Sequence, residues 1–198
     1  MLFLKILVYL LNVVFDAFCM MCLLRVYMQY AKVSFVNPVG QIIIKLTNWL
    51  ILPLQRVLPH IRRFDFPSTF AAYLCSFAHF LFLWLLLMPQ TETGLIHSYS
   101  IGQSLLFLAW LALLNLVKLL IYLLTAIILV NAVLSWLQPA HTQHSFAGWL
   151  LHQLSAPLLA PVQKRIKPYQ GLDFSPLVVL LILQVCLLVV VEFMGFVG

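Results

Sequence analysis

The chain has 198 residues, of which 64% are hydrophobic and only 8% are charged. Soluble domains carry about a quarter charged residues, so this composition excludes an ordinary water-soluble protein and predicts that lipid covers most of the surface. Eleven Lys and Arg against five Asp and Glu give a formal net charge of +6. In a membrane protein such an excess marks the cytoplasmic loops rather than a nucleic-acid site.

The amino-terminal stretch has an early Lys5 and a long apolar run, but no small-residue cleavage site, so we interpret it as a retained anchor. A helix needs about twenty apolar residues to cross the hydrocarbon. Four stretches qualify, roughly 3–30, 68–88, 104–137 and 175–197. The third is longer than one crossing needs, and its part before Asn115 and Lys118 is compatible with the outer interface.

Basic residues predict the orientation, because Lys and Arg in short loops stay on the cytoplasmic side. The first loop carries Lys32, Lys45, Arg56, Arg62 and Arg63, and the third carries Lys164, Arg165 and Lys167. The middle loop and the carboxy-terminal tail carry none. We therefore expect a multi-pass membrane protein, with both basic loops in the cytoplasm and both termini outside.

The two halves of the chain match each other. Arg25 aligns with Asn131, at an offset of 106 residues. Pro53 aligns with Pro161, and the Asp65-Phe66 pair aligns with the Asp173-Phe174 pair, both at an offset of 108 residues. This pattern predicts two parallel repeats, residues 1–90 and 102–198, each with two membrane helices. We expect a pseudo-two-fold axis along the membrane normal, unlike the inverted repeats of many transporters.

Each basic loop also holds a predicted amphipathic helix that lies in the interface. In residues 38–52 the polar side chains Gln41, Lys45 and Asn48 form a narrow stripe, and residues 145–156 repeat the pattern. Asn37 before Pro38 is a typical helix start, as is Ser175 before Pro176. Prolines should end these helices and turn the chain back to the bilayer; they are Pro53, Pro59, Pro157, Pro161 and Pro168.

The motifs LLRVYMQYA, FVNPVGQIIIKLT and PLQRVLP, with QLSAPLLAPVQKRIKP and GLDFSP in the second half, resemble the YggT family of bacterial membrane proteins, which has plastid relatives. The resemblance covers nearly the whole chain. It implies an all-α fold of four transmembrane helices in the bacterial inner membrane. It also implies association with membrane-complex assembly, the cell envelope, division and tolerance of osmotic stress. It implies no catalytic residue or cofactor. Two positions depart from the family's pattern. Arg62 or Arg63 stands where the family usually has a glycine, a few residues after the first basic segment, and Pro168 comes one residue later than the family's proline.

The basic segments between prolines are the first candidate sites. They could bind anionic lipid headgroups or an acidic partner peptide, or they could simply anchor the loops, with each charge contributing about 1 kcal/mol near an anionic leaflet. The candidate residues are Arg56, Arg62, Arg63, Lys164, Arg165 and Lys167.

Charged residues within the spans cost roughly 3 kcal/mol each on insertion scales and are functional candidates for that reason. Asp16 is near the middle of the first span, and Lys118 aligns one turn away from it in the repeat. We expect Lys118 to pair with Asp16 or with Glu192, either as an ion or proton site or as a contact between helices. Arg25 is near the inner end of its helix, where we expect it to snorkel to the interface.

Metal and cofactor sites are not predicted. Cys19 and Cys22 share a helical face but lack the second pair of ligands that zinc needs, and His141 and His144 have no partners of that kind nearby. We predict a non-enzymatic scaffold or assembly factor, bound to lipids, to membrane proteins or to copies of itself. The alternative is a small oligomeric channel or transporter in ion homeostasis.

Overall fold

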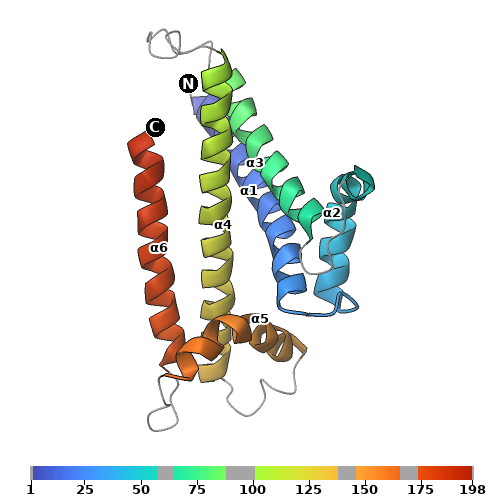
Figure 1. Ribbon diagram of the computed structural model, residues 1–198, viewed down its shortest axis with the longest axis vertical. Helices are drawn as coiled ribbons and strands as arrows, with labels where there is room; N and C mark the ends of the chain where they lie inside the picture. Colours follow the sequence, from blue (N-terminus) through green and yellow to red (C-terminus); the bar gives the residue numbers. More distant parts are fainter. Residues whose placement is uncertain (1, 58–64, 88–100, 138–145, 166–173, 198) are drawn as a thin grey trace.

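The computed structural model describes residues 2–57, 65–87, 101–137, 146–165 and 174–197 (Figure 1). These residues form helices α1 (Leu2–Tyr30), α2 (Pro38–Val57), α3 (Phe66–Leu87), α4 (Ile101–Leu137), α5 (Phe146–Gln163) and α6 (Ser175–Val197). The remaining residues lie outside the description, among them the candidates Pro59, Arg62, Arg63, Lys167, Pro168 and Asp173 and the pair His141 and His144. The expected all-α class is confirmed.

Within the described residues, four helices are long and apolar enough to cross a membrane: α1, α3, α4 and α6. They correspond to the four predicted stretches, which confirms a multi-pass membrane protein. α4 runs without a break for 37 residues, past Asn115 and Lys118. At 1.5 Å per residue it is about 55 Å long, so it exceeds the roughly 30 Å hydrocarbon core and extends beyond the core or tilts within it.

The two halves repeat the same packing plan. α1 contacts α2 and α3, and α2 contacts α3; in the second half α4 contacts α5 and α6, and α5 contacts α6. Cys22 belongs to a buried cluster of α1, α3 and α4, and Ile128, its counterpart 106 residues later, belongs to a buried cluster of α4, α5 and α6. The internal repeat predicted from the sequence is therefore also a repeat of structure.

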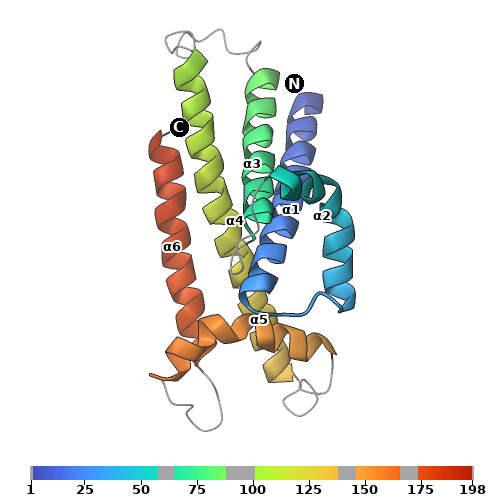
Figure 2. The same cartoon turned by 45° about the vertical axis from the view of Figure 1, so that its right-hand side comes forward.

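The relation between the halves differs from the expected two-fold. α4 packs against both α3 and α1, whereas the contacts of α6 with other helices are to α4 and α5. In both Figure 1 and Figure 2, α4 stands between α6 and the first half. A closed two-fold pair would repeat the α3–α4 contact as an α6–α1 contact. The described helices follow each other head to tail instead.

The two loop helices take different positions. α5 lies across the lower ends of α4 and α6, as expected of an interfacial helix, whereas α2 runs beside the last turns of α1 and bends near its own end (Figures 1 and 2). The prolines expected to end these helices lie inside them: Pro53 in α2, and Pro157 and Pro161 in α5. Each proline removes one hydrogen bond and bends the helix without stopping it.

The start of α2 is capped by Asn37. Its side-chain Oδ1 accepts a hydrogen bond from the Gly40 amide at 2.6 Å, and its carbonyl accepts one from the Gln41 amide at 3.0 Å. A side-chain oxygen before the first turn satisfies an amide that has no partner within the helix. Gly40 is required by close packing, because a Cβ there would lie 2.8 Å from the Phe35 Cα.

Candidate functional site

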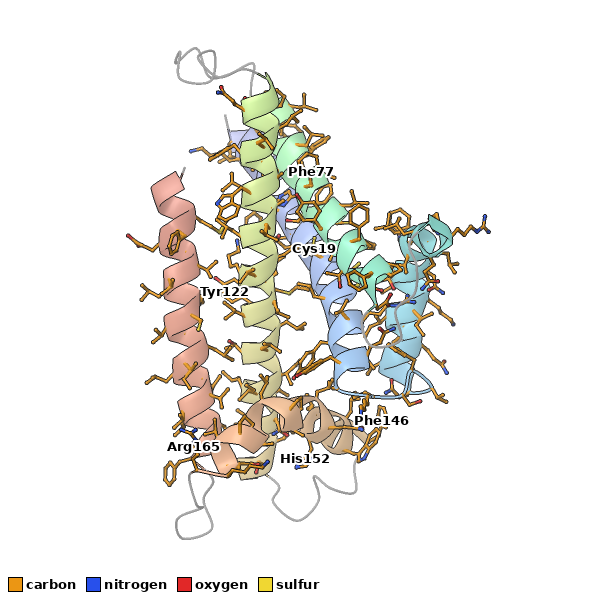
Figure 3. The ribbon with its side chains drawn as sticks, viewed as in Figure 1. Cys19, Phe77, Tyr122, Phe146, His152 and Arg165 are labelled. Atoms are coloured by element: carbon orange, nitrogen blue, oxygen red, sulfur yellow. The ribbon has the colours of Figure 1, made fainter. Side chains whose placement is uncertain are left out.

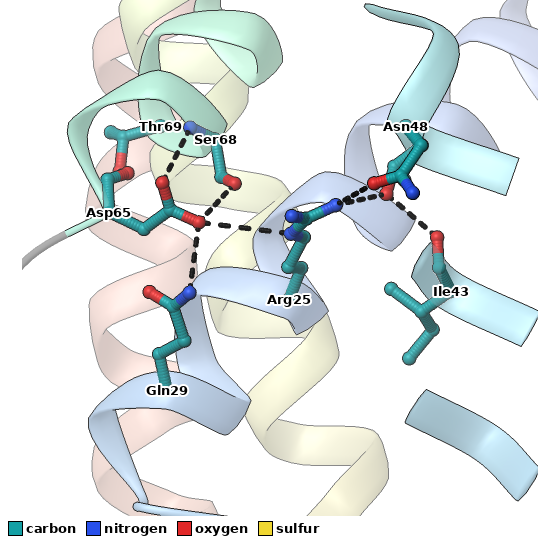
Figure 4. A network of polar contacts seen from close by, with 8 residues as sticks. Arg25, Gln29, Ile43, Asn48, Asp65, Ser68 and Thr69 are labelled. Carbon is teal, nitrogen blue, oxygen red and sulfur yellow. Dashed lines mark hydrogen bonds and ion pairs between the residues drawn. The ribbon is translucent and has the colours of Figure 1, made fainter. Parts of the chain in front are cut away.

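A buried polar cluster joins the three helices of the first half (Figure 4). Its centre is Asp65, 2% exposed, which precedes the first residue of α3. One carboxylate oxygen accepts a hydrogen bond from the Ser68 amide at 3.3 Å, which makes Asp65 the cap of α3. The other oxygen accepts hydrogen bonds from the Ser68 hydroxyl and from the Gln29 side chain of α1.

Arg25 links this carboxylate to α2. Its Nε lies 3.7 Å from the Asp65 carboxylate, and its Nη1 donates to the Thr47 hydroxyl at 3.1 Å and to the Asn48 side chain at 2.9 Å. Thr47 in turn donates to the Ile43 carbonyl of its own helix. One guanidinium therefore joins α1, α2 and the start of α3, which a planar group with five donors is well suited to do.

The prediction that Arg25 snorkels to the interface is wrong. The residue is 9% exposed because α2 and the cap of α3 cover it. Sequence reasoning placed Arg25 and Asp65 on separate motifs and missed their contact. The counterpart of Arg25 in the second half is Asn131, so this ionic arrangement belongs to the first half of the chain.

A second polar cluster lies inside the spans. The His79 ring of α3 is stacked on Phe15, and its Nε2 lies 2.7 Å from the Asn12 Oδ1 of α1. An amide oxygen only accepts, so Nε2 carries the proton, and Nδ1 of a neutral ring offers a lone pair. This buried Nδ1 has no hydrogen-bond partner and lies 4.0 Å from an Asp16 carboxylate oxygen. The His79 ring and the Asp16 carboxylate thus face each other near the middle of a span.

Asn115 extends this cluster to α4. Its side-chain nitrogen lies 3.4 Å from the Asp16 carboxylate and 3.3 Å from the Ser76 hydroxyl, which donates to the Ala112 carbonyl. The expected ion pair of Lys118 is not formed: among the described residues, Asp16 is near His79, and Lys118 pairs with neither Asp16 nor Glu192. The prediction from level alone missed the direction of each side chain around its helix axis, which brings His79 of α3 and Asn115 of α4 to Asp16.

The basic candidates that the structure describes are exposed. Lys164 and Arg165 directly follow α5, below the start of α6, where Figure 3 labels Arg165. Arg56 lies in the last turn of α2. In Figure 1 the end of α2 lies beside the first turns of α3, whereas α5 ends at the lower end of α6. Arg56 is therefore not adjacent to Lys164 and Arg165, and the other basic candidates lie outside the described residues.

The remaining motif residues have structural positions. α6 begins at Ser175, so Ser175 is the first residue of the helix rather than the one before it, and Pro176 follows within the first turn. Cys19 and Cys22 are buried, with Cys19 Sγ against the Ala72 carbonyl. No group of three or more metal-ligand side chains occurs in the part of the chain that the structure covers. The Tyr27 hydroxyl donates to the Leu154 carbonyl and ties α1 to α5.

Comparison with known proteins identifies relatives along most of the chain. A protein of Vibrio alginolyticus, described as an uncharacterized protein in the proC 3' region, is 33% identical over 176 residues, which cover 89% of this chain and 88% of the relative. The protein YggT of Escherichia coli K12 is 32% identical and covers 90% and 86%, and PA0392 of Pseudomonas aeruginosa is 26% identical and covers 93% and 88%.

No solved structure matches the chain. The CCB3/YggT family model matches twice, over residues 4–86 and 110–194. These two segments cover most of the α1–α3 unit and most of the α4–α6 unit described above. The chain is therefore a membrane protein of the CCB3/YggT family, built from two tandem copies of the family's unit.

Proposed function

We propose that the protein is a non-enzymatic membrane scaffold or assembly factor, which binds anionic lipid headgroups or acidic segments of envelope proteins through its cytoplasmic basic residues. The observation that carries this proposal is the separation of charge. Among the described residues, Lys32, Lys45, Arg56, Lys164 and Arg165 are exposed, whereas the ion-paired carboxylates belong to Asp16 and Asp65 and contact other groups. The exposed cations are thus available to an external anion.

The pair after α5 is the strongest part of this surface. Lys164 and Arg165 are adjacent and exposed at the lower end of the bundle, beside a helix that lies across it. Two basic groups near an anionic leaflet contribute about 2 kcal/mol together. This binding energy is modest, so the scaffold holds partners reversibly and with strong dependence on salt.

The test is charge reversal at Arg56, Lys164 and Arg165 to Glu, with purification in native lipid discs. We expect loss of copurified anionic phospholipid and of partner proteins. A conservative variant with Lys164→Arg keeps the charge and serves as the matched control. Since removing cytoplasmic basic residues can invert a protein, the topology of each variant is verified first. Unchanged lipids and partners in a correctly inserted variant would contradict the proposal.

The orientation belongs to this proposal and has its own measurement. Reporter tags inserted at positions 60 and 165 should both be cytoplasmic, and tags at the two termini should both be periplasmic. The basic loops dictate this result through the positive-inside rule. Tags at 60 and 165 on opposite faces would remove the common basic side on which the scaffold depends.

A second candidate is a small oligomeric channel or transporter for ion homeostasis and osmotic tolerance. It is favoured by the His79 ring and the Asp16 carboxylate, two titratable groups that face each other within the spans 4.0 Å apart. Reconstituted protein should then pass protons or monovalent cations, and Asp16→Asn or Lys118→Met should abolish the flux. His152→Gln, on the exposed side of α5, is the control. Silent liposomes at high protein density would count against it.

A further inference from the structure

The contact between the two halves supplies a template for a contact between two molecules. α4 lies against α3 through three polar contacts: the Tyr73 hydroxyl donates to the Ala109 carbonyl at 3.3 Å, the Ser76 hydroxyl donates to the Ala112 carbonyl at 3.1 Å, and Asn115 donates to Ser76 at 3.3 Å. We call this contact the seam. The seam is head to tail: it uses α3 of the first half and α4 of the second half. The corresponding faces of α6 and α1 take no part in it.

The unused surface on α6 corresponds to the α3 side of the seam. With the offset of 108 residues, Ser76 corresponds to Gln184 and Tyr73 to Leu181. Ser76 is fully buried, whereas Leu181 is 66% exposed and Gln184 is also exposed. Gln184 lies near the middle of α6 and has no hydrogen bond to any residue that the structure describes. An amide in hydrocarbon without a partner is costly.

The unused surface on α1 corresponds to the α4 side of the seam. With the offset of 106 residues, Ala112, Asn115, Leu116 and Leu119 correspond to Ile6, Tyr9, Leu10 and Val13. The four α4 residues are between 0% and 8% exposed, whereas their α1 counterparts are 49%, 67%, 54% and 48% exposed. The positions that are buried in the seam on α4 are therefore exposed at the corresponding positions of α1.

The face of α4 beside α6 also corresponds to a buried face of the first half. In the first half, Asp16 and Leu23 of α1 form the wall that receives α4, through Asn115 and through a shared apolar cluster. Their counterparts on α4 are Tyr122 and Leu129, which are 42% and 49% exposed. Figure 3 shows Tyr122 between α4 and α6. Among the described residues, the α4–α6 pair thus exposes the counterparts of the residues that receive α4 in the first half.

We propose that α1 of a second copy of this chain packs against α4 and α6, as α4 packs against α1 and α3 within one copy. The two copies have the same orientation in the membrane, because the repeats are parallel. The Tyr9 hydroxyl of one copy then donates to the Gln184 side chain of the next, at the positions where Asn115 and Ser76 meet within one copy. Such a contact is heterologous and builds a ring or an open row.

Polar matching distinguishes a second copy from lipid as the occupant. Lipid tails cover an apolar helix face equally well at every position, but they offer nothing to Gln184 or to the Tyr9 hydroxyl. Hydrogen bonds between membrane helices stabilise the association of those helices. The proposed interface is independent of the basic surface, so the docking function can fail while this contact stands.

The test is cross-linking in lipid discs or native membranes, with the four native cysteines replaced by Ala and folding checked by circular dichroism. Tyr9→Cys and Gln184→Cys are made separately and together. A mixture of the two single variants should give one disulfide-linked dimer, each single variant alone should remain monomeric, and the double variant should give a ladder or a closed ring.

Ile182→Cys is the matched control. It lies on the other side of α6 and is 49% exposed, and its counterpart Leu74 on α3 is also exposed rather than part of the seam. Paired with Tyr9→Cys it should give no dimer. A short bis-maleimide reagent repeats each reaction where disulfide geometry is unfavourable. Self-linking of Tyr9→Cys alone, or no Tyr9–Gln184 product with either chemistry at high protein density, would overturn the proposal.

Discussion

Removing the carboxylate of Asp65 should be among the most destabilising single changes in the first half. Asp65 and Arg25 form a buried ion pair, with side chains 0% and 10% exposed. Truncating one partner of such a pair leaves an uncompensated charge and costs about 3–5 kcal/mol. In Asp65→Ala, loss of the cap of α3 accounts for about 1 kcal/mol of this cost. Asp65→Asn keeps a capping oxygen and should cost correspondingly less.

The reverse truncation should cost less. In Arg25→Met the carboxylate keeps its bonds from Gln29 and Ser68 and lies at the positive end of a helix. In the double variant Arg25→Met with Asp65→Asn neither charge is left unpaired, so its cost should be smaller than the sum of the single costs by about 1–3 kcal/mol. Burying an apolar side chain in place of an ion pair is often close to neutral.

The assay is reversible unfolding in mixed micelles by titration with a denaturing detergent, followed by tryptophan fluorescence. Arg56→Met serves as the control, because Arg56 is exposed at the end of α2, and its stability should change by no more than about 0.5 kcal/mol. Additive costs of the two single variants would refute the reasoning, since they would mean that Arg25 and Asp65 do not interact energetically.

Two further substitutions test the loop helices. Gly40→Ala places a Cβ 2.8 Å from the Asn37 Oδ1 and should weaken the cap of α2 by about 1–2 kcal/mol; Gly195→Ala, with nothing within 4 Å of the new Cβ, should be neutral or slightly stabilising in the same unfolding assay. Tyr27→Phe leaves the Leu154 carbonyl without its donor from α1 and should cost about 1 kcal/mol. In hydrogen exchange it should loosen α5 more than α3, and equal effects on both helices would contradict the assigned contact.

The spans and loop helices could be predicted because their signals are local. Length and apolarity place α1, α3, α4 and α6, and the Asn37-Pro38 pair places the start of α2. Internal similarity also predicted the duplication, because each copy keeps its own pattern along the chain. These features depend on neighbouring residues and on the thickness of the bilayer, which a single sequence contains.

The polar clusters could not be predicted in the same way, because they depend on which faces meet. Arg25 and Asp65 are 40 positions apart in the sequence, and neither motif indicates that α2 packs over both residues. Depth alone put Lys118 near Asp16, but rotation of the helices brings His79 of α3 to Asp16 instead. Level in the membrane can be counted along a helix, whereas direction around its axis follows from packing.

The order of helices in the head-to-tail fold has a consequence for biogenesis. Since α1, α2 and α3 contact one another, the first half can close around its ionic cluster as soon as residue 87 has been made. α4 then arrives at a finished surface, and α6, the last to be synthesised, finds its place against α4 and α5. Each new span after α1 thus meets a partner that is already in the bilayer.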